Sequence, residues 1–126
     1  QEMGFGVEGQ VLVQDGEPVE QALRDGIESG YHVIVTTGGT GLTPLDLTPE
    51  MTRRVLEREV PGIAEAIRAA GVATVPAAAL SRAVAGVAGS TLVVNLPGST
   101  GGVRDGLAVL RPILVHAVDQ IHGGDH

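Results

Sequence analysis

The sequence has no cysteine, no lysine and no tryptophan, and it has only one tyrosine and one phenylalanine. Without cysteine the chain can form no disulfide bond, no thiol nucleophile and no cysteine-ligated zinc site. Because all 8 basic residues are arginine, a P-loop lysine and Schiff-base chemistry are excluded as well. The 15 acidic residues bring the net charge to −7, which argues against nucleic-acid binding, since that requires a basic face.

The composition predicts one packed domain. Of the 126 residues 43% are hydrophobic and 18% are charged, and the mean hydropathy is +0.22. This length suits a single hydrophobic core. The most apolar stretch, residues 103–121, contains arginine, aspartate and proline, so we expect no membrane-spanning helix. The first residues also lack the pattern of a signal peptide. We therefore expect a soluble, cytoplasmic protein.

Apolar runs and turn residues alternate along the first half of the chain. A short run at Val11–Val13, closed by an Asp-Gly pair, predicts a strand that ends in a turn. The stretch Pro18–Gly30 predicts a helix with one apolar face, and His32–Val35 predicts a buried strand. Thr48–Glu50 has the composition of a helix start, with Thr48 as the N-cap. This alternation is typical of an α/β sheet.

The second half of the chain predicts a different arrangement. Pro61–Gly71 is expected to form a short helix. Ala83–Val87 and Thr91–Val94 are expected to form a β-hairpin, which makes the sheet mixed. A long helix with one apolar stripe should follow along Val103–Ile121, and Pro112 should kink or split it.

The first candidate for a binding site is the loop Thr36–Gly41, TTGGTG, which follows the predicted strand His32–Val35. Glycine has no Cβ atom, so backbone N–H groups can approach an anion, and a nearby helix N-terminus favours negative charge. In an open α/β sheet, ligands bind at the carboxyl ends of strands. A plain flexible turn is an equally good interpretation of these residues alone. The loop does not match the dinucleotide-binding glycine motif, because Pro44 stands where the third glycine of that motif should be.

Two aspartates should lie close to this loop. Asp46 follows it just before a predicted helix, and Asp15 ends the first predicted strand at the same edge of the sheet. Two carboxylates beside a phosphate-binding loop suit Mg²⁺-assisted phosphoryl chemistry, because Mg²⁺ prefers hard oxygen ligands. From spacing alone the alternative is favoured, in which Asp15 is a turn residue and Asp46 complements the helix dipole.

Two further segments have residues suited to anion binding. Ser81 and Arg82 together can hold a phosphate, although a surface Ser-Arg pair is common. Pro97–Ser99 precedes the last predicted helix and is either an anion cradle or a rigid turn. Glu50 is expected to complement the helix dipole, and Asn95 to satisfy loop backbone.

Several motifs follow one another in a fixed order along the chain. They are residues 36–50 (TTGGTGLTPLDLTPE), 60–62 (VPG), 80–82 (LSR) and 95–99 (NLPGS). In this order they resemble the signature of the MoaB/Mog family of molybdenum-cofactor biosynthesis proteins, to which the G domains of gephyrin and Cnx are related. The resemblance extends over nearly the whole chain, and motifs in a shared order are more specific than any one of them.

The resemblance implies a fold, an activity and a set of site residues. The fold is a three-layer α/β/α sandwich with a mixed, mostly parallel sheet, in one molybdopterin-binding domain over residues 1–126. The activity is that of a molybdopterin adenylyltransferase, which binds molybdopterin and Mg-ATP and transfers AMP to the terminal phosphate of the pterin. A homotrimer is implied as well. Asp15 and Asp46 are then the catalytic and Mg²⁺-binding residues, and the substrate-binding residues are Thr37, Gly38, Gly39, Thr40, Gly41, Ser81, Arg82, Pro97, Gly98 and Ser99, followed by Glu50 and Asn95.

Some positions depart from the family pattern. Leu45 stands where many members have arginine, and Gly101 stands where they commonly have lysine. Both changes remove positive charge from an anion site, so a non-catalytic molybdopterin-binding or carrier protein is a second hypothesis. A relative of the competence-damage (CinA) domain that acts on nucleotides is a third. The family also begins with a further strand and a glycine-containing loop, and we expect this chain to be an incomplete copy without them.

Overall fold

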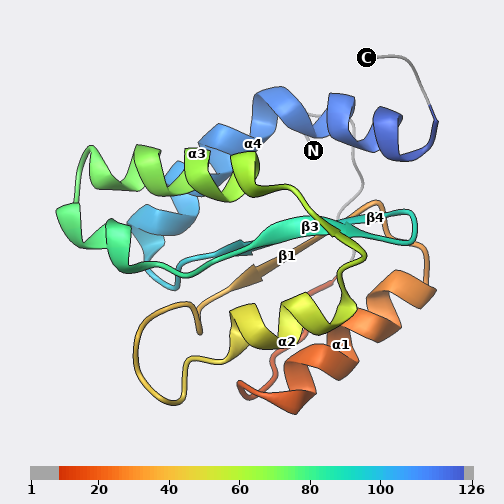
Figure 1. Ribbon diagram of the computed structural model, residues 1–126, viewed down its shortest axis with the longest axis horizontal. Helices are drawn as coiled ribbons and strands as arrows, with labels where there is room; N and C mark the ends of the chain where they lie inside the picture. The colour runs from red at the N-terminus through yellow and green to blue at the C-terminus, as the bar shows by residue number, and fades with distance from the viewer. Residues whose placement is uncertain (1–8, 124–126) are drawn as a thin grey trace.

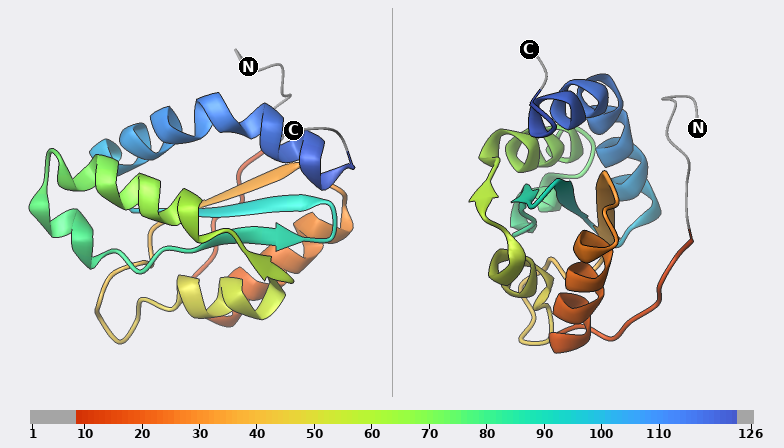
Figure 2. Two further views of the ribbon diagram at one scale, coloured as in Figure 1. Left: turned by 45° about the horizontal axis from the view of Figure 1, so that its top comes forward. Right: turned by 90° about the vertical axis from the view of Figure 1, so that its right-hand side faces the viewer.

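A four-stranded sheet lies between two pairs of helices, as Figures 1 and 2 show. This computed structural model describes residues 9–123. In chain order the elements are α1 (Glu17–Glu28), β1 (Val33–Thr37), α2 (Thr48–Val55), β2 (Arg58–Glu59), α3 (Pro61–Val72), the 3₁₀ helix η1 (Pro76–Leu80), β3 (Ala85–Ala88), β4 (Thr91–Leu96) and α4 (Thr100–Ile121). Helices α1 and α2 cover one face of the sheet and α3 and α4 cover the other, so the predicted three-layer α/β/α sandwich is confirmed.

The strand order is β1-β4-β3-β2, and the sheet is mixed. The prediction of a mostly parallel sheet is wrong for the described strands, because β1 and β4 are parallel while β4–β3 and β3–β2 are antiparallel. The reason lies in the connections: Gly89 and Ser90 alone join β3 to β4, and so short a loop can only reverse the chain. Gly89 has a φ of +58°, which glycine adopts without strain. The predicted hairpin is confirmed.

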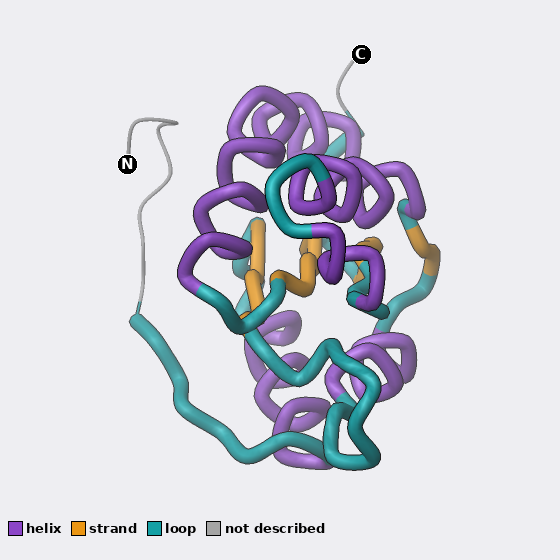
Figure 3. The backbone as a smooth tube through the Cα atoms, turned by 90° about the vertical axis from the view of Figure 1, so that its left-hand side faces the viewer, coloured by secondary structure: helices purple, strands orange, loops and turns teal. Residues whose placement is uncertain are grey.

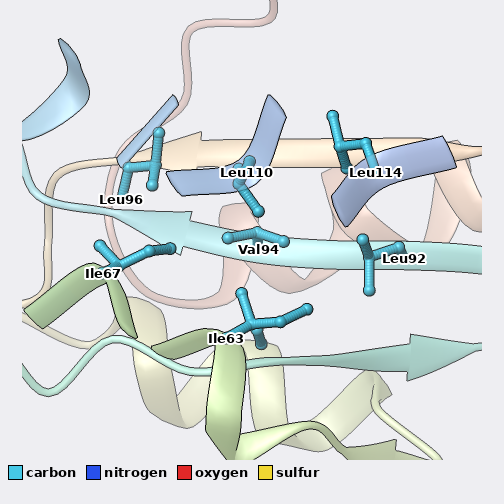
Figure 4. Close-up of a cluster of buried hydrophobic side chains, with 8 residues drawn as sticks. Ile63, Ile67, Leu92, Val94, Leu96, Leu110 and Leu114 are labelled. Atoms are coloured by element: carbon cyan, nitrogen blue, oxygen red, sulfur yellow. The ribbon is translucent and has the colours of Figure 1, made fainter. Parts of the chain in front are cut away.

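Strand β4 lies between two apolar clusters. Every residue of β4 is buried, and its side chains alternate between the two faces of the sheet. Figure 4 shows the cluster between the sheet, α3 and α4, which consists of Ile63, Ile67, Ala85, Leu92, Val94, Leu96, Leu110 and Leu114. The cluster on the opposite face consists of Val19, Leu23, Met51, Val55 and Val93. The core therefore fixes helices on both sides of one central strand.

The helix ends follow local signals in the sequence. Helix α1 begins after Gly16, whose φ is +97°, and has Pro18 in its first turn. It ends just before Gly30, whose φ is +83°, as predicted. At the start of α4, the hydroxyl of Ser99 accepts a hydrogen bond of 3.0 Å from the amide of Gly102, so Ser99 is the N-cap.

The strand expected at Val11–Val13 does not form, and of the two outcomes expected at Pro112, a kink or a split, the split does not occur. Val11–Val13 forms no strand: the segment is irregular, and Val11 and Leu12 are 78% and 100% exposed. An apolar run forms a strand only where a neighbour accepts its hydrogen bonds, and no described strand pairs with this one. Helix α4 is continuous through Pro112 and is therefore not split, although its ribbon arches in Figure 1. None of the helices within residues 9–123 is long and apolar enough to cross a membrane.

The burial of α4 leads to a stability prediction. Leu110 is 0% exposed in the cluster shown in Figure 4, whereas Leu107, on the same helix, is 40% exposed. Leu110→Ala should lower the free energy of unfolding by about 3 kcal/mol, because it removes buried methyl groups and leaves a cavity. The matched variant Leu107→Ala should lower the free energy of unfolding by less than about 1 kcal/mol. Urea unfolding followed by circular dichroism measures both, and equal losses would contradict the assignment of the core.

Candidate functional site

Two glycine-containing loops meet where the parallel strands β1 and β4 end. Thr37 and Leu96 are the last paired residues, so both loops leave the same edge of the sheet, which faces the viewer in Figure 3. The amide of Gly38 donates to the carbonyl of Leu96 at 3.0 Å. A Cβ atom on Gly98 would lie 3.3 Å from the Cα atom of Gly38, whose φ is +88°. The two backbones approach this closely because both residues are glycine.

In the loop after β1, three successive carbonyl groups accept hydrogen bonds from the rest of the protein. The carbonyl of Gly39 accepts from the amide of Thr48 at 3.2 Å. The carbonyls of Thr40 and Gly41 accept from the amide and the Nε atom of Arg82, both at 2.8 Å. None of the described peptide bonds is cis, and in a trans peptide the N–H group points opposite to the carbonyl group. The amide that follows each carbonyl is therefore directed away from these partners.

This arrangement leaves a row of free amides. The amides of residues 39–42 donate to no protein acceptor within residues 9–123. A backbone N–H group needs a partner, and at this loop water or a ligand must supply it. Gly38 and Gly39 both have positive φ, +88° and +68°, and successive N–H groups in such turns form concave anion sites. The loop that we predicted to bind an anion thus has the donors for it.

Asp15 lies against this loop, although it reaches it from an irregular segment and not from a strand. Its Oδ2 atom accepts from the amide of Leu47 at 3.1 Å, and its Oδ1 atom accepts from the hydroxyl of Thr48 at 3.1 Å. A Cβ atom on Gly39 would lie 2.5 Å from Oδ2 of Asp15, so glycine makes room for the carboxylate. The prediction that Thr48 is the N-cap of α2 is wrong, because the helix begins at Thr48 and Asp15 accepts from its first groups.

Asp46 is half-buried beside the same loop. Its Oδ2 atom accepts from the amide of Thr43 at 3.0 Å and from the hydroxyl of Thr43 at 2.8 Å. A Cβ atom on Gly41 would lie 2.9 Å from this oxygen. Its Oδ1 atom has no hydrogen-bond donor in the described part of the chain. The carboxylate is therefore fixed by one oxygen next to the free amides and keeps the other available.

Arg82 and Glu50 form an ion pair at the back of the loop. The Nη1 atom of Arg82 donates to Oε2 of Glu50 at 2.5 Å, and its Nη2 atom donates to the carbonyl of Asp46 at 2.5 Å. This hydrogen bond with Glu50 raises the pKa of Arg82, and it lowers the pKa of the Glu50 carboxyl. The pair is partly exposed, with 32% and 43% of the two side chains accessible, so solvent screens it. The guanidinium is engaged by protein groups on three sides.

Asn95 lies below the loop in a buried polar network. It is 1% exposed, and its Oδ1 atom accepts from the amide of Val84 at 3.1 Å. Its Nδ2 atom donates to the hydroxyls of Thr36 and Thr52 at 2.9 and 3.0 Å. The hydroxyl of Thr52 donates in turn to the carbonyl of Thr48 at 2.7 Å. The network joins β1, β4 and α2, so Asn95 acts on the loop through its supports.

The remaining predicted residues lie at the periphery of this arrangement. The Oγ atom of Ser81 accepts from the amide of Ala83 at 3.3 Å, and Ser81 and Arg82 line a hollow of about 440 Å³ beside α2, α3 and β3. Pro97–Ser99 lies next to Gly38, and the hydroxyl of Ser99 is occupied as the cap of α4. The structure therefore brings Asp15, Asp46, Arg82, Glu50 and Gly98 to the loop Thr37–Gly41 and places Asn95 beneath it.

The supporting roles of three residues were not predicted from the sequence. Thr36 and Thr52 belong to the Asn95 network. Arg68 donates to the carbonyls of Ser81 and Ala83 at 3.3 and 2.9 Å. The one available signal was the pair Thr48 and Thr52, which lie one helical turn apart and share the face of α2 that is turned to the loop.

The carboxylates at the loop fit Mg²⁺ held together with a ligand. No group of three or more histidines, aspartates or glutamates that could hold a metal ion lies within residues 9–123. Mg²⁺ commonly takes one or two protein carboxylates and completes its shell with water and substrate phosphates. Asp46 offers a free oxygen, and Oδ2 of Asp15, which accepts one hydrogen bond, has a second lone pair, whereas Oδ1 of Asp15 accepts from both the Gly16 amide and the Thr48 hydroxyl. The donor set suits a metal ion that arrives with a phosphate.

The sequence matches a known family over residues 1–116, and that family is described as a probable molybdopterin-binding domain. The "Molybdenum cofactor synthesis protein cinnamon" of Drosophila melanogaster is 40% identical over 114 residues, which are 90% of this chain and 19% of that protein. The "Molybdopterin adenylyltransferase" of Haemophilus influenzae is 41% identical over 98 residues, which are 76% of this chain and 50% of that protein. The chain thus spans half or less of the length of these two curated relatives.

Solved structures share both fold and sequence with the chain. The molybdopterin biosynthesis Mog protein from Mycobacterium ulcerans superposes with a TM-score of 0.85 at 58% sequence identity. The match covers 86% of this chain and 72% of the Mycobacterium ulcerans chain. The arrangement of helices and strands described above is therefore that of Mog proteins.

The Asn95 network leads to a prediction of stability. Asn95→Ala removes the acceptor of one buried amide and the donor to two hydroxyls, so the free energy of unfolding should fall by about 3 kcal/mol. Gln21→Ala is the matched control, because this exposed amide on α1 makes one hydrogen bond, to Asp25; it should change stability by less than about 0.5 kcal/mol. Chemical unfolding measures both variants, and a loss for Asn95→Ala no larger than the control's would show that the network contributes nothing.

The ion pair between Arg82 and Glu50 leads to a prediction of pH dependence. Because the pKa of Glu50 is lowered in the folded protein, its contribution to stability is present above the ordinary glutamate pKa and is lost as the pH falls through the lowered value. Glu50→Gln should therefore be less stable than the wild type at pH 7, and the difference should shrink below pH 4. Parallel urea titrations from pH 7 to pH 3 measure this difference. If the difference in the free energy of unfolding between the wild type and Glu50→Gln stays constant with pH, the proposed role of the Glu50 charge is contradicted.

Proposed function

The chain belongs to the family of probable molybdopterin-binding domains, and we propose that it binds molybdopterin and Mg-ATP at the free amides of residues 39–42. Relatives named for molybdopterin adenylyltransferase and for molybdenum-cofactor synthesis support a role in the biosynthesis of that cofactor. The observation that carries the proposal is the row of free amides at the end of two parallel strands. Such amides bind phosphate oxygens without sequence-specific side chains.

The proposed reaction is adenylyl transfer. An oxygen of the terminal phosphate of molybdopterin attacks the α-phosphorus of ATP, the bond to the leaving pyrophosphate breaks, and adenylylated molybdopterin is formed. The free amides hold the anionic oxygens in place, and the fixed carboxylate of Asp46 orients the reacting groups. Mg²⁺, when bound through Asp46 and Asp15, neutralises charge on the phosphates. The chain needs no covalent nucleophile, in keeping with its lack of cysteine and lysine.

A second candidate function is a molybdopterin carrier without catalysis. It is favoured by Leu45, which is 78% exposed next to Asp46 and offers an apolar side chain where a cation would assist phosphate transfer. Gly101 in the first turn of α4 likewise supplies no charge. Calorimetry with molybdopterin separates the two functions, because a carrier binds the pterin tightly and turns over no ATP.

We further propose that the chain forms a homotrimer and that it is located in the cytoplasm. Support for self-association comes from apolar side chains on the surface at the end of α3 and around η1. Val72, Val75 and Leu80 are 39%, 54% and 55% exposed there. The absence of a spanning helix within residues 9–123 accords with a protein that works in solution.

Asp46→Asn tests the proposed catalysis. The amide oxygen of asparagine still accepts from Thr43, so the loop keeps its shape, but the negative charge is lost. With molybdopterin and Mg-ATP, formation of adenylylated pterin should slow by about 100-fold, because one preorganised electrostatic contact is removed. Asp25→Asn, on the exposed face of α1, is the matched control and should keep the wild-type rate. An undiminished rate in Asp46→Asn would remove the proposed role of this carboxylate.

A further inference from the structure

We infer that Arg82, with Glu50 as its partner, is a positioning residue that sets the direction of the free amides of Gly41 and Leu42 and does not bind the ligand itself. The inference rests on the proposed function for the identity of the ligand, molybdopterin. It differs from a direct phosphate contact, which is the role that the Ser-Arg motif alone would indicate.

The contacts of Arg82 all lie on the carbonyl side of the loop. Its amide donates to Thr40 at 2.8 Å, and its Nε and Nη2 atoms donate to the carbonyls of Gly41 and Asp46 at 2.8 and 2.5 Å. One residue therefore fixes three peptide planes of the segment that runs from the free amides to the catalytic carboxylate. Because each plane is rigid, holding the carbonyl on one side determines where the next N–H group points on the other.

The ion pair with Glu50 orients the guanidinium for this task. Nη1 of Arg82 donates to Oε2 of Glu50, which lies in the first turn of α2. Guanidinium is planar and carries its donors in fixed directions, so anchoring one nitrogen leaves Nε and Nη2 aimed at the two carbonyls. An ammonium group has no such geometry and can serve only one or two of these acceptors. Lysine at this position would keep the charge and lose the positioning.

Arg24 of α1 provides a matched control. Like Arg82 it donates to a carboxylate, Oε2 of Glu20 at 2.8 Å, and to a backbone carbonyl, that of Arg54 at 3.2 Å. It donates no hydrogen bond to residues 38–46. Arg24→Met should therefore carry the general cost of removing such a guanidinium without altering the loop, so any difference between the Arg24 and Arg82 variants reports on the loop itself.

The experiment compares Arg82→Lys, Arg82→Met, Glu50→Gln and Arg24→Met in the full chain. Nuclear magnetic resonance of the free protein gives the order parameter of the Leu42 amide, which follows the carbonyl held by the Arg82 side chain, and calorimetry gives the dissociation constant for molybdopterin. Both Arg82 variants should lower this order parameter from about 0.8 to below about 0.6 and weaken binding by about 10-fold or more. The Gly41 amide should change less, because the main-chain amide of residue 82 still holds the Thr40 carbonyl. Glu50→Gln should have an intermediate effect in the same direction, and Arg24→Met should match the wild type in both measurements.

Two results would overturn the inference. If Arg82→Lys binds as tightly as the wild type, the residue acts through its charge on the ligand. If Arg24→Met loosens the loop and weakens binding as much as Arg82→Met, the effect is one of general stability. Should Arg82→Met not fold, Glu50→Gln decides between these cases, because it removes only the partner of the guanidinium. A wild type that does not bind molybdopterin would overturn the proposed function, while the order parameters would still decide whether Arg82 positions the loop.

Discussion

The site depends on the rigidity of the peptide plane. A loop cannot offer its N–H groups to a ligand unless the carbonyl groups on the opposite side are satisfied elsewhere. In this protein the carbonyls of Gly39, Thr40 and Gly41 are bonded to the start of α2 and to Arg82. The direction of the free amides is therefore determined by contacts on the opposite side of the loop. Glycine at the positive-φ positions allows the turn, and these contacts select one form of it.

Helix α2 is the common support of these contacts. Within its first five residues, the amide of Thr48 bonds to the loop, Glu50 holds Arg82, and Thr52 bonds to Asn95. A helix of eight residues is not stable in isolation, so its position comes from Met51 and Val55, which pack against Val93 of β4. The apolar core on this face thus fixes the position of α2 against the central strand, and α2 in turn fixes the conformation of the loop.

Local signals in the sequence were enough to predict much of the fold and the loop that forms the candidate site. Helices α1 and α3 and the β3–β4 hairpin all have their limiting glycines and prolines in the sequence, and the glycine loop follows its strand directly. What the sequence could not reveal depends on partners far along the chain. The apolar run at 11–13 lacked a pairing strand, which no local pattern indicates. Arg82 contacts Gly41 and Glu50, which lie 41 and 32 positions away in the sequence, so a local motif cannot indicate that protein groups occupy its guanidinium.

In the proposed function backbone amides bind the anion, and the charge balance around the loop accounts for this. The chain carries a net charge of −7, and two carboxylates flank the loop, so an approaching phosphate meets negative charge. Arg82 contributes little to offset it, because its own charge is balanced by Glu50. Amide dipoles attract an anion, but they carry no net charge and therefore do not neutralise a polyphosphate. A divalent cation that arrives with the phosphates, held by the oxygen of Asp46 that the loop leaves free, would supply the missing positive charge. The acidic side chains and the anionic ligand would then both bind the same cation, so their negative charges would not exclude one another from the site.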